Sequence, residues 1–346
     1  MANPVLSRGG QVRGSGATWG AGATGLDADR ALMLKLGAAE VLDSFERSTV
    51  FKGKTRERNI RGGKSVAFPI TGRLSASYHQ PGTAITGTGN DPSDLNERVI
   101  SLDALMIADV AILEVDELMS FFDVRQVYTT ELGRALATEY DKRVARMIFA
   151  AASNTTEPLA KTLNAHKTGN SLTLGTDYTG SSATRQAKGD ALVNAIFDAR
   201  VAFEEKDVPI DGMYGVFTPE DYFLISQSSR AINADFNGGG GGNGTIASGQ
   251  TLQVAGIPIL MSNHVTQSAY TAVAGDHNAD YAQDLSKCKG LIFNKEAVGV
   301  LTLLSPGLQM TGPEYKVQYQ SELLVARQAI GMGQLRAECA CKIVIP

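Results

Sequence analysis

The sequence predicts an α+β protein in which one domain is interrupted by another. Residues 65–103 alternate weakly between apolar and polar side chains, as strands do, and residues 124–152 carry the apolar periodicity of one long helix. An α/β block and a set of strand-like segments then close the chain. The 346 residues have room for about two domains, and 43% hydrophobic residues supply an ample core.

Composition and charge exclude several classes of protein. Lys and Arg total 32 and Asp and Glu total 36, a net charge of −4 that does not favour nucleic-acid binding by the chain as a whole. Cys288, Cys339 and Cys341 form no even disulfide set and are typical of a reducing compartment. The start, MANPVLSRGGQ, lacks the apolar run of a secretion signal, and no uncharged apolar stretch reaches the roughly 18 residues of a membrane helix. We therefore expect a soluble protein made in the cytosol.

The amino-terminal part divides into an arm and a helix. Residues 1–25 contain seven glycines and little periodicity, which predicts a flexible arm. From Asp27 the pattern becomes that of an amphipathic helix. The apolar side of this helix is expected to carry Leu32, Leu36, Ala39, Leu42 and Phe45.

Two oppositely charged segments follow. Residues 52–73 hold seven Lys or Arg side chains against Glu57 alone, a net of +6, and residues 91–123 hold nine Asp or Glu side chains against Arg98 alone, a net of −8. Two interpretations stay open: each run is a solvated face, or a basic arm meets an acidic surface on its own or a neighbouring subunit. A nucleic-acid patch is disfavoured, since only Phe51 and Phe68 are available for base stacking.

Residues 65–103 are punctuated by glycine and proline and predict a long two-stranded excursion. The strongest predicted element comes next. Asp123 is a good N-cap with Gln126 in the capping-box position, and no proline interrupts the apolar pattern before Pro158. The helix should cover 124–152 and, at about 1.5 Å per residue, exceed roughly 40 Å in length. We expect it to be a structural spine whose buried face carries Leu132, Leu136, Tyr140 and Ile148.

The rest of the chain mixes helices and strands. Residues 153–189 predict a loop or hairpin, and a second amphipathic helix around Leu192 to Phe203 leads to a buried strand, MYGVF (213–217). Thr218 and Pro219 start another helix, and GGGGGNG (238–244) predicts a mobile surface loop. The later strand candidates are VAGIPILMS (254–262), KGLIFN (289–294), VGVLTLL (298–304), KVQYQSELLVARQAI (316–330) and ECACKIVIP (338–346).

No catalytic constellation emerges from the residues. Gly63-Lys64-Ser65 has the form of the end of a phosphate-binding loop, but that motif needs glycine where this chain has Arg58, and a strand-like run follows in place of a helix. The four histidines lack metal-ligand spacing, and Cys339 and Cys341 have no second pair. The acidic cluster Glu114, Asp116 and Glu117 favours a solvated or interface face over a cation site. We expect no catalytic residue, cofactor or metal.

Several segments, taken in order, resemble the major capsid proteins of the T-odd short-tailed phages. The stretch from Ser48 through Arg58, Gly62 to Ser65 and Phe68 to Gly82 is similar to the E-loop of that family. Residues 31–50, 98–137 and 326–345 are similar to it as well, and the co-linear order and spacing make the match specific. The middle, 153–310, departs more, notably at GGGGGNG.

The resemblance implies the Hong Kong 97-type phage capsid fold. An N-terminal arm with a short helix would cover 1–51 and an E-loop 52–97. The P-domain would comprise 98–185 and 306–346, with the spine helix at 124–152, and the A-domain would be inserted at 186–305. In such a fold, the basic E-loop residues Arg58, Arg61, Lys64 and Arg73 are expected to meet the acidic residues Glu114, Asp116 and Glu117 of another subunit.

The resemblance also implies a function and partners. Subunits would self-assemble as hexamers and pentamers of an icosahedral head in the host bacterial cytoplasm. A scaffolding protein would guide assembly, a portal would occupy one vertex, and double-stranded DNA would be packaged without sequence specificity and without a membrane. Because the arm begins at once, a separate scaffolding protein is expected. The alternatives are an encapsulin-type nanocompartment shell and, in a different class, a nucleotide-dependent enzyme built around Gly63-Lys64-Ser65.

Overall fold

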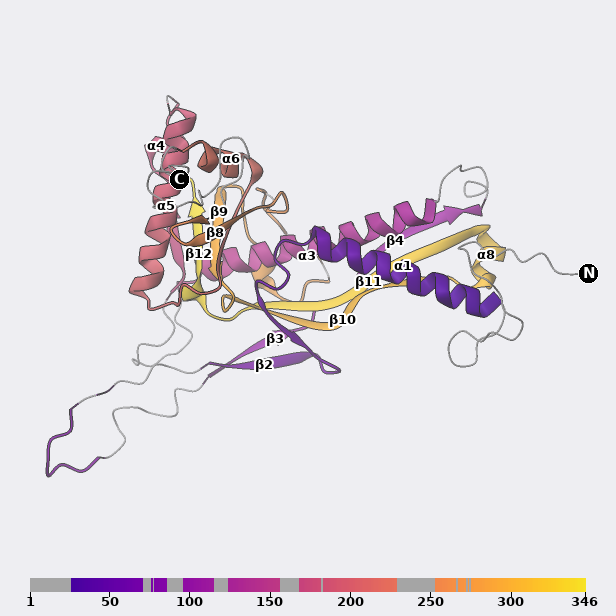
Figure 1. The fold of residues 1–346 in the computed structure, drawn as a ribbon. Coiled ribbons are helices and arrows are strands. Elements are labelled where there is room, and N and C mark those ends of the chain that lie inside the picture. Colours follow the sequence, from indigo (N-terminus) through magenta and orange to yellow (C-terminus); the bar gives the residue numbers. More distant parts are fainter. Residues whose placement is uncertain are drawn as a thin grey trace, which may run out of the picture. The chain divides into compact units, whose positions relative to one another are not determined.

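The structure is a computed structural model that describes residues 26–70, 76, 78–85, 96–114, 124–155, 168–181, 183–228, 253–265, 267–271, 273 and 275–346. Helices and strands are mixed along the chain (Figure 1), as the sequence predicted. The helices are α1 (Leu26–Ser48), α3 (Val124–Ser153), α4 (Thr176–Thr179), α5 (Arg185–Glu205), α6 (Pro219–Gln227) and α8 (Pro313–Tyr319). The strands are β1 (Arg56–Asn59), β2 (Ser65–Ile70), β3 (Asn96–Ser101), β4 (Met106–Leu113), β5 (Asn170–Thr173), β6 (Met213–Phe217), β7 (Gln253–Val254), β8 (Ile257–Met261), β9 (Cys288–Asn294), β10 (Val298–Met310), β11 (Ser321–Gln334) and β12 (Ala340–Val344).

The strands form three sheets among the described residues. A four-stranded sheet has the order β1-β10-β11-β4, a six-stranded sheet has the order β5-β12-β9-β6-β8-β7, and β2 pairs with β3 alone. The chain forms two compact units. One comprises Met1–Thr49, Leu105–Thr138 and Leu304–Ala329, and the other comprises Val50–Ala104, Glu139–Leu303 and Ile330–Pro346.

The larger unit contains the six-stranded sheet and its helices. β6 pairs in parallel with β8 and antiparallel with β9, so the two kinds of pairing mix in one sheet. α5 contacts β5 at one edge and β7 at the other, which means that this helix crosses a face of the sheet (Figure 1). Thr218 caps α6 through its side chain, with Pro219 in the first turn, so the predicted helix start is confirmed. The predicted strand 213–217 coincides with β6.

The smaller unit holds α1 close to the first half of α3. A Cβ added at Gly133 of α3 would lie 2.6 Å from the Val41 carbonyl oxygen and 2.8 Å from the Ser44 Cβ of α1. The Ser44 hydroxyl donates to the Thr130 carbonyl oxygen at 2.7 Å, and Thr129 donates to the Glu40 carboxylate at 2.7 Å. Glycine at 133 therefore permits a backbone approach that any side chain would prevent.

The two-stranded excursion begins with a short antiparallel pair in the larger unit. β2 and β3 pair from Ser65 with Ser101 to Ile70 with Asn96 (Figure 1). One face of the pair is apolar and packs on β10 and the segment after β11 in a small core of Phe68, Ile100, Leu301 and Leu335. This core anchors the root of the excursion.

The long helix is confirmed as one uninterrupted element over Val124–Ser153, with Leu132, Leu136, Tyr140 and Ile148 all buried. Its predicted cap, Asp123, lies outside the described residues, as do the arm 1–25 and the glycine loop 238–244. The helix α1 exists, but its buried side chains differ from the prediction. Phe45 is buried as predicted, but Ala39 and Leu42 are exposed and Val41 and Ser44 are buried, because α1 turns toward the close contact at Gly133.

Two other predictions were wrong in detail, those over 316–330 and 153–189, and the strand at 56–59 was not predicted. The strand predicted over 316–330 begins only at Ser321, because Pro313 starts the helix α8 before it. Residues 56–59 do not join the two-stranded excursion but pair in parallel with β10, from Arg56 with Gly299 onward. Within 153–189, the structure has a strand, β5, and the short helix α4, because β5 adds in parallel to β12 rather than forming a local hairpin.

Candidate functional site

The basic surface predicted to contact a neighbour begins at β1. Arg56 and Arg58 occupy alternate positions of this fully exposed strand, so they share a face. Their guanidinium carbons lie 5.9 and 5.8 Å from the centre of the Phe68 ring. Arg61 and Lys64 are exposed in the turn to β2, and Arg73 lies outside the described residues. Three of the predicted basic side chains are therefore exposed to solvent within one short segment, at Arg58, Arg61 and Lys64.

The acidic surface is described only in part. Glu114 follows β4, is partly exposed, and forms an ion pair of 3.6 Å with Lys316 of α8 in its own subunit. Asp116 and Glu117 lie outside the described residues. No ion pair among the described residues joins the basic set to Glu114. The predicted contact between subunits therefore stays a prediction.

The loop at Gly63-Lys64-Ser65 lacks the architecture of a phosphate-binding loop. Ser65 begins a strand, β2, where that motif needs a helix N-terminus. The Lys64 carbonyl oxygen accepts a hydrogen bond of 2.8 Å from the Leu102 backbone N–H, which ties the turn to β3. The turn connects strands and does not present backbone N–H groups at the end of a helix.

The three cysteines are free and buried. Burial raises the pKa of the Cys288 thiol to about 12 and that of the Cys341 thiol to about 12. A thiol with so high a pKa carries almost no thiolate at neutral pH, so these side chains are core residues and poor nucleophiles. Among the described residues, no group of three His, Cys, Asp or Glu side chains is placed to hold a metal ion. None of the helices in the described part of the chain is both long and apolar enough to span a membrane.

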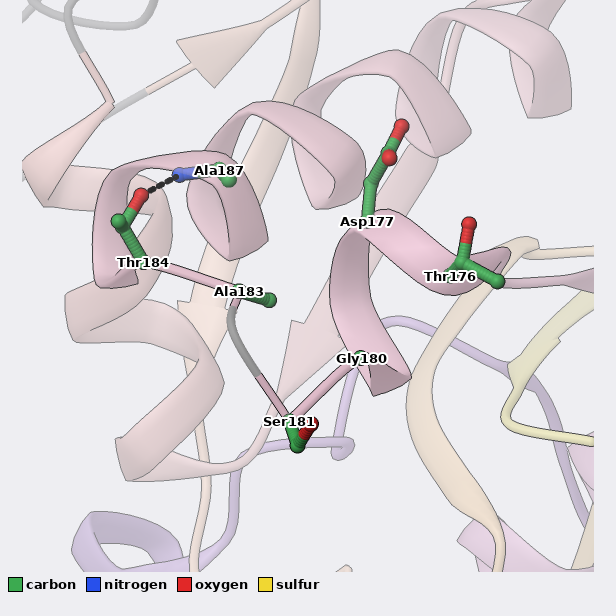
Figure 2. A pocket seen from close by; sticks show the side chains of 7 residues that line it. All are labelled: Thr176, Asp177, Gly180, Ser181, Ala183, Thr184 and Ala187. Carbon is green, nitrogen blue, oxygen red and sulfur yellow. Dashed lines mark hydrogen bonds between the residues drawn. The ribbon is translucent and has the colours of Figure 1, made fainter.

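A hollow of about 400 Å³ lies between α4 and the start of α5 (Figure 2). Its lining is made of small and hydroxyl-bearing residues with one carboxylate, Asp177. Thr184 uses its hydroxyl to cap α5 by accepting from the Ala187 backbone N–H at 3.2 Å, as Figure 2 shows. Among the described residues that line the hollow there is no histidine, cysteine or lysine, and the one ionisable side chain is Asp177.

One carboxylate joins three segments of the larger unit, and sequence analysis missed it. Asp141 of α3 is completely buried. It accepts hydrogen bonds from the backbone N–H groups of Val50 at 2.9 Å and Phe51 at 3.4 Å, and from Nδ1 of His264 at 2.7 Å. The only signal in the sequence is an acidic residue directly after Tyr140 in the apolar pattern. Asp141 therefore holds the start of the basic segment and the loop after β8 against α3.

A second polar network lies further along α3. Arg143 contacts the Asp276 carboxylate at 2.5 Å, and the Tyr270 hydroxyl donates to the other oxygen of Asp276 at 2.8 Å. Burial would raise the pKa of Asp276, but hydrogen bonds from Tyr270 and Val273 and the charge of Arg143 hold that pKa below its ordinary value. Nearby, burial raises the pKa of Asp103, which accepts from the Tyr281 hydroxyl at 2.6 Å. These groups bind one another, which indicates a structural joint and not a reaction centre.

Comparisons with known proteins match a single family over most of the chain. The family model described as "Gp10A-like: Major capsid protein" matches residues 67–344. The major capsid protein of Enterobacteria phage T3 is 30% identical over 324 residues, which cover 91% of this chain and 92% of that protein. The major capsid protein of Escherichia phage T7 is 28% identical over 325 residues, with 91% and 92% covered.

A solved capsid structure has a similar fold and a similar sequence. The capsid structure of the cyanophage P-SCSP1u aligns with a TM-score of 0.74 and 34% sequence identity, covering 86% of this chain and 88% of that one. Its similarity extends over helices and strands from both compact units. The chain therefore belongs to the Gp10A-like family of phage major capsid proteins and has the Hong Kong 97-type fold that its sequence predicted.

Proposed function

We propose that this protein self-assembles as hexamers and pentamers into the icosahedral head of a short-tailed phage that encloses double-stranded DNA. The match to the T3 major capsid protein over 91% of the chain carries this proposal. The chain's role is structural, and its activity is symmetric self-association. In this proposal 1–51 form the arm, 52–97 the E-loop, 98–185 with 306–346 the P-domain, and 186–305 the A-domain.

The proposal includes three kinds of partner besides the chain itself. A separate scaffolding protein sets the curvature of the growing shell, and a portal takes one vertex. Double-stranded DNA fills the head without sequence specificity, in keeping with a chain of net charge −4 that has no overall basic balance. Assembly takes place in the host bacterial cytoplasm. Expression of the full chain with its scaffolding protein tests this directly: cryo-electron microscopy should show closed icosahedral shells, and dispersed monomers would contradict the proposal.

The contact between subunits is proposed to be electrostatic. The basic E-loop residues, of which Arg58, Arg61 and Lys64 are exposed, would meet the acidic P-domain surface of another subunit, including Glu114. The remaining members of the two sets are Arg73, Asp116 and Glu117. Each exposed pair contributes only about 0–1 kcal/mol, but a head-to-tail contact repeats in every subunit of a closed ring.

A double charge reversal tests the contact. Arg61→Glu with Lys64→Glu should give subunits that do not close shells, because two attractive pairs become repulsive at each contact. Thermal unfolding of the unassembled subunit should stay nearly unchanged, since both side chains are exposed and away from the core. Arg134→Glu on α3 serves as the control, because in the described part of the chain this exposed arginine pairs with Glu131 of its own helix. Normal shells from the double variant would show that the basic run is a solvated face.

An encapsulin-type shell shares the fold and is the second candidate. The match to phage major capsid proteins favours the phage head. Nuclease-protected DNA of uniform length inside particles from infected cells would support the phage head, whereas an enzyme as the enclosed cargo would support the encapsulin.

A further inference from the structure

Two arginines lie over one aromatic ring at the root of the excursion, and a third is the cross-strand partner of that ring's residue. Arg56 and Arg58 of β1 lie over Phe68 of β2, which is itself only 5% exposed. Arg98 of β3 is the direct cross-strand partner of Phe68, so its side chain leaves the pair on the same face as the ring. We call Arg56, Arg58 and Arg98 the arginine cluster. Sequence analysis had placed Arg98 in the acidic run 91–123, and only the pairing of β2 with β3 brings it to the basic segment.

The arginine cluster has no carboxylate partner among the described residues. Two partly buried arginines elsewhere have such partners: Arg143 pairs with Asp276, and Arg336 pairs with Glu296 and Glu338 at 2.5 Å each. Glu57 lies between Arg56 and Arg58 in sequence, but strand alternation turns it to the opposite side, where it accepts from the Gly53 backbone N–H at 2.8 Å. Neither the two arginines over the Phe68 ring nor its cross-strand partner Arg98 therefore has a carboxylate bound to it in the described chain.

Arg98 also has a polar atom without a partner. Its Nε is buried and makes no hydrogen bond to the described residues. A buried N–H without an acceptor destabilises the protein, and more so when it belongs to a charged group. The side chain borders a polar pocket of about 170 Å³ whose other walls include His277, Asn278 and Gln334. Asp280 also lines the pocket, and one of its oxygens already accepts from the Gln334 amide at 2.7 Å. The Asn278 amide already donates to the Met332 carbonyl oxygen and the Gln334 amide to Asp280, so Arg98 Nε is a donor that the pocket leaves unused.

We infer that Arg98 binds a carboxylate side chain of a second copy of this chain, which enters the pocket and accepts from the Arg98 guanidinium. This inference rests on the proposed shell, in which every subunit meets identical neighbours. The chain supplies such groups, since its 36 acidic residues exceed its 32 basic ones and nine of them crowd residues 91–123. A carboxylate carries one negative charge and fits the narrow pocket beside Asp280. The phosphates of a DNA duplex lie on a wide, stiff surface that cannot enter so small a space, which disfavours packaged DNA as the partner.

The test uses the opposite effects that Arg98→Met should have on the free and the assembled protein. In the unassembled full chain, the melting temperature should stay the same or rise, because the variant removes a buried N–H that has no acceptor. In assembly with the scaffolding protein, the yield of closed shells at equal protein concentration should fall by about tenfold or more, as expected when one partner of a buried charged pair is lost. Arg98→Lys, which keeps the charge but not the planar donors, should fall between Met and wild type. Arg134→Met is the matched control at an exposed arginine and should assemble normally.

Each of the other possible results would contradict the inference for a different reason. Wild-type yield from Arg98→Met would overturn it while leaving the proposed shell intact. A lower melting temperature of the unassembled variant would show that Arg98 supports the fold of its own subunit. Normal shells that package less DNA would identify a phosphate as the ligand. Failure of wild type and Arg134→Met alike to form shells would instead contradict the proposed function.

Discussion

Individual buried polar residues of the larger unit are placed where segments of the chain meet. Asp141 accepts from two backbone N–H groups and from His264, so a single carboxylate satisfies donors from two other segments. Asp276 does the same for Arg143, Tyr270 and the Val273 backbone. Buried carboxylates with complete hydrogen-bond sets rigidify the joints they occupy. In a subunit that must present the same surface to every neighbour, such rigidity has a direct use.

The ionisation of Asp276 makes the stability of the subunit depend on pH. Its folded-state pKa lies below its ordinary value, so it contributes stability that is present above the unfolded-state pKa near 4 and is lost as the pH falls through the folded-state value. Asp276→Asn should therefore lower the free energy of unfolding at pH 7 by about 3–5 kcal/mol, the range for a buried pair that loses one partner. Denaturant unfolding of the unassembled chain at several pH values measures this.

The difference between variant and wild type should shrink below the unfolded-state pKa. Asp103 titrates with the opposite sign, because burial raises its pKa, but it is present in both proteins and cancels in the difference. A difference in stability that does not vary between pH 7 and pH 3 would show that the ionisation of Asp276 is not the cause.

Among the helices and strands, α3 is the element on which both compact units depend. It supplies its residues up to Thr138 to one unit and those from Glu139 to the other. Its apolar side chains recur at helical spacing and are buried along its length, including Leu136 at 1% exposure and Ile148 at 0%. Helix propensity alone does not keep such a helix straight and uniquely placed, whereas continuous burial does.

Leu136→Ala should destabilise the unassembled subunit by about 2–5 kcal/mol, because it leaves a cavity at a fully packed site. Val127→Ala on the same helix is the control. Val127 is 52% exposed, and its truncation should change the free energy of unfolding by less than about 0.5 kcal/mol. Chemical denaturation of both variants measures the contrast. Equal effects would mean that the burial of Leu136 contributes little to stability.

At the scale of the whole protein, positive and negative side chains are concentrated in different segments. The net charge is +6 over 52–73 and −8 over 91–123. A subunit with such fields should associate with its neighbours in a way that depends on salt, since the Debye length is about 8 Å at physiological ionic strength. The structure adds that the basic segment is exposed at Arg58, Arg61 and Lys64 and that Arg56 and Arg58 have no carboxylate partner in the described chain.

Assembly of the full chain should therefore weaken as sodium chloride rises from about 0.05 to 0.5 M, where the Debye length falls to a few ångströms. Light scattering of the purified chain with its scaffolding protein follows the change. The Arg61→Glu and Lys64→Glu double variant should not assemble at any of these concentrations. Assembly that strengthens steadily with salt would show that apolar contacts, and not the charged segments, dominate the association.

The sequence was sufficient for whatever depends on neighbours along the chain. The apolar period and the absence of proline define α3 to within one residue of the predicted end, and Thr218 with Pro219 defines the start of α6. The co-linear segments also identified the capsid family. Tertiary structure alone decided the pairing of β1 with β10, the partners of Asp141 and the pairing of Arg98 with Phe68. The reason is physical: periodicity is set within a few residues, whereas strand register and buried polar contacts join residues far apart in the chain, and only the packing of the complete core selects one such pairing over the others.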